Sequence, residues 1–141
     1  MVEQAQKLAK LISGRDLSFA NLAHGDLRNA NLRGTKLLGA DLTQANLDFA
    51  DAASTVHQEL PVCAGHRTLG ECGADFRAAV LSYASMRQAN LLGADFYAAD
   101  LSRTELEGTS FLQSRLALAS FYSSRLNGAD LLPRRFSWGK L

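Results

Sequence analysis

Two cysteines and two histidines lie close together near the middle of the sequence. Residues 55–73 read TVHQELPVCAGHRTLGECG and contain His57, Cys63, His66 and Cys72. Imidazole nitrogens and cysteine thiolates are ligands that Zn²⁺ prefers, and four of them would complete a tetrahedral site. The Cys-x-x-His spacing suits such a site, but the gaps on either side match no standard zinc finger. A Cys63–Cys72 disulfide and two free cysteines are the alternatives, and in a reducing compartment we expect free thiols and no metal or cofactor.

Elsewhere, residue types that perform catalysis occur without the spacing that catalysis requires. The sequence contains no GxGxxG loop, no Walker loop and no GxSxG motif. The carboxylates of Asp16, Asp75 and Asp95 could pair for acid–base work, but Lys36 and Arg115 alternate with them at the same position of a repeat. Charge compensation explains that alternation better than proton transfer does. We therefore expect no enzymatic activity.

A repeat of five residues positions these side chains. Large apolar residues recur at every fifth place, first from Leu17 to Ala52, where seven of eight are leucine, and again from Phe76 to Leu131. The residue two places earlier is nearly always small, and the residue just before is often Asp or Asn. A period of five fits neither a helix nor a simple strand. It predicts short extended segments that point both apolar positions inward and are joined by tight turns.

The repeat resembles that of the pentapeptide-repeat proteins. It reads A-(D/N)-L-x-x, as in Ala20-Asn21-Leu22 and Ala40-Asp41-Leu42, and covers residues 15–54 and 74–133, which is twenty repeats. The resemblance implies an all-β fold, a right-handed quadrilateral parallel β-helix (β-solenoid) with four repeats per coil. Twenty repeats then make about five coils.

The ends of the repeat and its one interruption predict how the chain is organised. Both ends of a solenoid expose apolar faces and strand edges, which the termini are expected to cover. We expect a short amphipathic helix over Val2–Leu11. The predicted segments are an N-terminal cap (1–14), coils one and two (15–54), an inserted loop (55–73), coils three to five (74–133) and a C-terminal cap or dimerisation tail (134–141).

Stacking places every twentieth residue in register once the insertion is removed. One outer column then contains three leucines above one another, and a contiguous apolar stripe often marks an interface. Nearby tyrosines and the aromatic tail add surface of the kind that interfaces enrich. The expected protein interface comprises Leu92, Leu112, Leu132, Tyr97, Tyr122, Phe136 and Trp138.

A second outer column alternates in charge. It contains Arg28, Asp48, Arg87 and Glu107 in successive coils. Opposite charges at adjacent positions of a ladder attract weakly, so we interpret this column as structural.

Charge and hydropathy limit the classes of partner and the cellular location that we expect. The net charge is +1, so no strong attraction to nucleic acid or an anionic membrane is expected. No apolar run approaches the length of a membrane span. Residues 1–13 include Glu3, Lys7 and Lys10, and so lack the apolar block of a secretory signal. We expect a cytoplasmic location.

These observations favour a non-catalytic scaffold that binds an unknown protein partner through its surface and inserted loop, and that could form a homodimer through its C-terminal end. The resemblance implies an alternative, a DNA mimic that binds DNA gyrase or another topoisomerase, as quinolone-resistance proteins of this type do. A DNA mimic needs continuous negative potential. The acidic face is interrupted by Arg28, Arg33, Arg77, Arg87 and Arg103.

Overall fold

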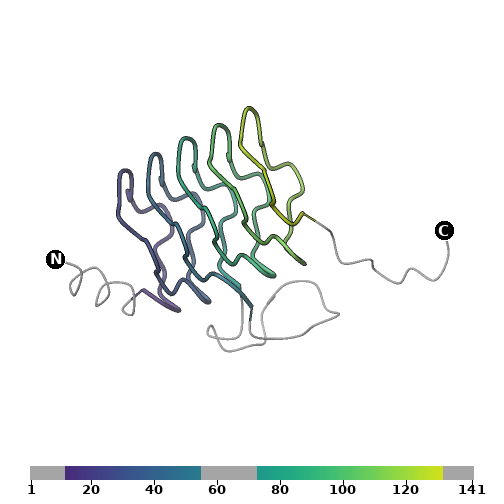
Figure 1. Cartoon of the computed structure of the whole chain (residues 1–141). Helices are drawn as coiled ribbons and strands as arrows, with labels where there is room; N and C mark the ends of the chain where they lie inside the picture. The colour runs from purple at the N-terminus through teal and green to yellow at the C-terminus, as the bar shows by residue number, and fades with distance from the viewer. Residues whose placement is uncertain (1–11, 55–72, 132–141) are drawn as a thin grey trace.

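The computed structural model describes residues 12–54 and 73–131. Over these residues the chain winds into five coils that stack side by side (Figure 1). Residues 20 apart pair through parallel bridges, beginning with Asp16 and Lys36. The stacking of every twentieth residue, predicted from the sequence, is therefore confirmed. The coils begin at Asp16, Lys36, Asp75, Asp95 and Arg115.

Four columns of bridges run along the stack, one for each pentapeptide of a coil, and they define four sides. The first side contains Asp16, Lys36, Asp75, Asp95 and Arg115; the second contains Asn21, Asp41, Val80, Asp100 and Ser120; the third contains Asp26, Asn46, Ser85, Glu105 and Arg125; the fourth contains Asn31, Asp51, Asn90, Ser110 and Asp130. Going around a coil in chain order, the second and fourth sides are opposite each other.

The sides are shorter than regular strands. Within residues 12–54 and 73–131 each pentapeptide contributes a single isolated bridge residue, and these residues form neither a helix nor a longer strand. The reason is that a turn consumes most of every five residues. The helix expected over Val2–Leu11 lies outside the described residues. In the described part of the chain there is no helix with the length and apolarity needed to cross a membrane.

Each corner is a tight turn with a left-handed residue. In the first repeat the Leu17 carbonyl accepts a hydrogen bond from the Ala20 N–H at 3.1 Å. Phe19 between them has a φ of 61°, the signature of a type II turn. The same position has positive φ in repeat after repeat around the described coils. The Asp16 carboxylate also accepts the Ser18 N–H at 3.0 Å, so the Asp/Asn position fixes the turn through its side chain.

Backbone hydrogen bonds join each coil to the next, and apolar side chains fill the interior. The Leu17 N–H donates to the Lys36 carbonyl at 2.7 Å. Inside coils three to five, phenylalanines continue from one coil to the next: Phe76 stacks on Phe96 with centroids 4.6 Å apart, and Phe111 meets Phe96 edge-on at 5.5 Å. The large inward residues of coils two to four are buried, whereas those of the end coils, apart from the buried Leu32, are at least partly exposed.

The coils keep their register across residues 55–72. The bridge from Lys36 to Asp75 spans 39 residues instead of 20, yet both belong to the same column. The chain closes at this corner because the Ala74 N–H donates to the Ala52 carbonyl at 2.9 Å. Gly73 leaves the necessary room, because a Cβ on Gly73 would lie 2.5 Å from the Gly93 carbonyl oxygen of the next coil.

Candidate interaction surface

The ion pairs of the described residues lie on three of the four sides. On the first side, Lys36 pairs with Asp16, Arg77 with Asp75, and Arg115 with Asp95. On the third side, Arg28 pairs with Asp26, and Arg87 with both Asp48 and Glu105. On the fourth side, Arg33 pairs with Asp51. No ion pair of the described residues lies on the second side.

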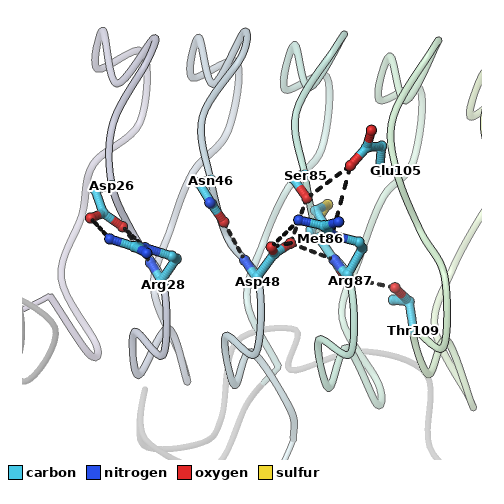
Figure 2. A network of polar contacts seen from close by, with 9 residues as sticks. All are labelled: Asp26, Arg28, Asn46, Asp48, Ser85, Met86, Arg87, Glu105 and Thr109. Atoms are coloured by element: carbon cyan, nitrogen blue, oxygen red, sulfur yellow. Dashed lines mark hydrogen bonds and ion pairs between the residues drawn. The ribbon is translucent and has the colours of Figure 1, made fainter.

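On the third side, a polar network that includes Asp48 of coil two, Arg87 of coil three and Glu105 of coil four links three coils (Figure 2). Asp48 Oδ1 accepts hydrogen bonds from the Ser85 hydroxyl at 2.5 Å and from the Arg87 N–H at 2.9 Å. The Arg87 guanidinium lies 3.0 Å from Asp48 Oδ2 and 3.7 Å from Glu105. Ser85 occupies an Asp/Asn position but lacks the carboxylate that would cap its own turn. Asp48 supplies that oxygen from the neighbouring coil.

The hydrogen bonds of Asp48 also control its protonation. Burial alone would raise the pKa of Asp48, but hydrogen bonds from Ser85 and Arg87 and the nearby guanidinium outweigh it, so the pKa lies below its ordinary value. The same contact raises the pKa of Arg87. The pair therefore stays ionised at neutral pH and serves to hold the coils together.

The expected charge ladder is confirmed only for its Asp48–Arg87 step. Arg28 pairs with Asp26 of its own repeat, at 2.7 Å. Glu107, next above Arg87, forms no ion pair among the described residues, and its Oε2 is buried without a hydrogen-bond donor. Within this column, the opposite charges of Asp48 and Arg87 therefore stabilise the junction of coils two and three.

Aromatic and apolar side chains gather on and beside the second side, the side without an ion pair among the described residues. Nine large apolar or aromatic side chains are exposed in the described part of the chain, and five of them lie on the second side of coils three to five or on the part of the first side next to it. We call these five the tyrosine surface: Val80, Tyr83, Tyr97, Leu118 and Tyr122. Leu118 and Tyr122 are the most exposed, at 74% and 69%.

Two arginines support the tyrosine rings. The Arg103 guanidinium lies 5.3 Å from the centroid of the Tyr83 ring and donates to the Tyr83 hydroxyl. Arg115 lies 4.7 Å from the centroid of Tyr97 while pairing with Asp95. A cation over an aromatic face is attracted by the ring quadrupole. These contacts consequently hold the two rings in fixed orientations.

The structure separates residues that the sequence grouped together. Leu92 and Leu112 lie on the fourth side, where Leu112 is exposed and Leu92 only partly so. Tyr97 lies on the neighbouring first side, but Tyr122 lies on the second side, facing the opposite way from the leucines. Three other predicted interface residues lie outside the described residues: Leu132, Phe136 and Trp138.

The four metal-ligand candidates, His57, Cys63, His66 and Cys72, also lie outside the described residues. Over residues 12–54 and 73–131, no group of three or more His, Cys, Asp or Glu side chains is arranged to hold a metal ion.

Comparison with known proteins agrees with this architecture. The family model described as pentapeptide repeats matches in eight copies, over residues 16–51, 73–108 and 99–131. The chain belongs to the pentapeptide-repeat family. Membership implies a right-handed β-helix, and proteins of this family are generally non-enzymatic structural or interaction scaffolds. No curated protein matches the sequence.

Solved structures of pentapeptide-repeat proteins resemble the chain to differing degrees. One from the thylakoid lumen of Arabidopsis thaliana is 26% identical with a TM-score of 0.48, and the match covers 89% of this chain and 69% of that one. Rfr23 from the cyanobacterium Cyanothece 51142 is 19% identical, with coverages of 96% and 97% and a TM-score of 0.33. QnrB1, a plasmid-mediated fluoroquinolone resistance protein, is 21% identical, with coverages of 84% and 66% and a TM-score of 0.38.

Within this pentapeptide-repeat chain, sequence reasoning missed Val80, Tyr83, Arg103 and Leu118. The signal was available in the stacking register, because Tyr83 and Arg103 are 20 residues apart on one side. Val80 was a second signal, since it occupies a position where most repeats have a polar residue. Departures from the repeat at outward positions therefore identify the surface better than a column of leucines does.

Proposed function

We propose that this pentapeptide-repeat protein is a non-catalytic scaffold that binds a protein partner through the tyrosine surface. The observation that carries the proposal is the gathering of five exposed apolar and aromatic side chains on and beside the second side, which has no ion pair among the described residues. Protein interfaces are enriched in Tyr and Arg and have few charged residues at their centre.

The rigidity of the scaffold favours binding. Each coil is hydrogen-bonded to the next, and Tyr83 and Tyr97 rest against arginines. Side chains that are already ordered lose little conformational entropy when a partner docks. The inserted loop of residues 55–73 remains a second proposed contact, and all of it except Gly73 lies outside the described residues.

Site-specific photo-crosslinking tests the proposal. Benzoylphenylalanine at position 122 is expected to crosslink a protein partner in extracts of the source cells, because Tyr122 is 69% exposed. Phe49 is the control, since it is also an exposed aromatic side chain but lies on the third side. Equal crosslinking from positions 122 and 49, or crosslinking from position 49 alone, would contradict the proposal.

The charge distribution argues against the DNA-mimic alternative. The described residues include nine Lys and Arg against eleven Asp and Glu, a net charge of −2. Arginines pair with carboxylates on three sides, which interrupts any phosphate-like potential. In a gyrase supercoiling assay we expect neither inhibition by the protein nor protection from a quinolone. Either effect would instead support the alternative.

A further inference from the structure

Arg103 differs from the arginines that hold the other sides together. Five arginines of the described chain pair with carboxylates: Arg28, Arg33, Arg77, Arg87 and Arg115. Arg103 is in no ion pair of the described residues, and its side-chain contacts are the ring and hydroxyl of Tyr83. The remaining N–H groups of its exposed guanidinium are therefore available to a partner.

The surroundings of Arg103 leave its guanidinium able to donate hydrogen bonds to a planar acceptor. In register it stands between Tyr83 of coil three and Ser123 of coil five, directly beside Tyr122. Asp100, the carboxylate of the same repeat, accepts the Ser102 N–H at 2.9 Å and forms no ion pair with Arg103 among the described residues. The exposed Tyr83 thus lies against a guanidinium whose charge no carboxylate of the described residues neutralises by contact.

We infer that Arg103 receives the carboxylate of an Asp or Glu side chain from the partner protein. This inference rests on the proposed function, because it names the chemistry that the tyrosine surface recognises. The guanidinium presents a rigid fork of donors that matches a carboxylate with two parallel hydrogen bonds. The acidic residue has apolar or aromatic neighbours in its segment, because the exposed Tyr83 and Tyr122 share with the arginine the corner between the second and third sides.

The test uses random twelve-residue peptides displayed on phage and selected on the immobilised full-length protein. Selected peptides are expected to share one Asp or Glu beside apolar or aromatic residues. Synthetic versions should bind the Arg103→Gln variant about 10- to 100-fold more weakly than the unmodified protein, the range for hydrogen bonds to a charged group. Gln is a suitable replacement because Gln44, Gln88 and Gln113 adopt the same left-handed conformation. An Arg125→Gln variant, altered on the third side, is the matched control and should bind normally.

A second comparison identifies the pair. Replacing the peptide's acidic residue by its amide should weaken binding to the unmodified protein but change little in the Arg103→Gln variant. The inference is overturned if selection yields no shared acidic residue, if no peptide is selected, or if Arg103→Gln binds as tightly as the unmodified protein. Should Tyr122→Ser abolish binding that Arg103→Gln leaves intact, the proposed surface stands and only the carboxylate inference fails. Peptides indifferent to both variants would refute both.

Discussion

Replacing Asp48 by asparagine should destabilise the protein more than the same change at Asp26. The Asp48 side chain is only 8% exposed and accepts two hydrogen bonds from the Arg87 guanidinium, at 3.0 and 3.3 Å. Asparagine retains an oxygen for the Ser85 hydroxyl and the Arg87 N–H but loses the charge. Because Arg87 is half-exposed and can rehydrate, we expect a loss of about 1–2 kcal/mol rather than the 3–5 kcal/mol of a fully buried pair.

Asp26 provides the matched control. It pairs with Arg28 at 2.7 Å, but the two side chains are 46% and 58% exposed. Exposed pairs contribute little, so Asp26→Asn should cost less than about 0.5 kcal/mol. Urea unfolding followed by far-ultraviolet circular dichroism measures both. For a slope near 2 kcal/mol/M, the midpoint of Asp48→Asn should fall by about 0.5–1 M and that of Asp26→Asn should barely move.

Acidity offers an independent measurement of the same pair. The folded-state pKa of Asp48 lies below its ordinary value, so the ion pair stabilises the protein at any pH above the unfolded-state pKa of about 3.9. That contribution is lost as pH falls through the folded-state pKa. The stability difference between the unmodified protein and Asp48→Asn should therefore shrink below about pH 4. Equal urea midpoints for the two asparagine variants, or a difference that persists at pH 2, would refute the reasoning.

Three further results are expected. Gly73→Ala should destabilise the protein by about 2–3 kcal/mol, because its Cβ would meet the backbone of the next coil at 2.5 Å. Gly128→Ala, whose Cβ would have no neighbour nearer than 3.8 Å, should cost only about 1 kcal/mol for its positive φ. Urea unfolding midpoints compare the two variants. Phe96→Ala should cost about 3–5 kcal/mol, and Phe121→Ala clearly less since Phe121 is only partly buried, so equal costs would contradict the core described above. In hydrogen exchange, the backbone amides of coil five should lose protection before those of coil one. Three of the bridge positions of coil five, Arg115, Ser120 and Arg125, have no Asp or Asn side chain to cap their turns.

The fold could be predicted from the sequence because its interior is narrow and its period is short. Large residues at every fifth place and small residues two places earlier leave few ways to bury both. What the repeat could not show is cooperation between different positions. Ser85 departs from the Asp/Asn rule, and Asp48 compensates from another coil. Arg28 similarly pairs with Asp26 of its own turn rather than with the next coil, a choice decided by side-chain geometry.

The candidate surface was predicted only in part, for a geometric reason. Columns that are near in sequence can lie on opposite sides of a four-sided coil, as Leu112 and Tyr122 do. The sequence pattern therefore predicts an apolar stripe within a single column of the repeat. The exposed side chains gather instead along the second side and at both of its corners. Tyr97 and Leu118 lie at the corner that it shares with the first side, in consecutive coils, and Tyr83 and Tyr122 lie at the corner that it shares with the third.

At the corner formed by Ala52 and Ala74, the shape of the solenoid does not depend on the length of the connecting segment. One backbone hydrogen bond of 2.9 Å joins the two residues, and the glycine at position 93 accommodates both incoming segments. Whatever sequence connects them, the coils on either side meet the same neighbours. Since lengthening a flexible connection costs only about 0.6 kcal/mol per doubling, foreign peptides grafted between residues 54 and 73 would be displayed without disturbing the architecture.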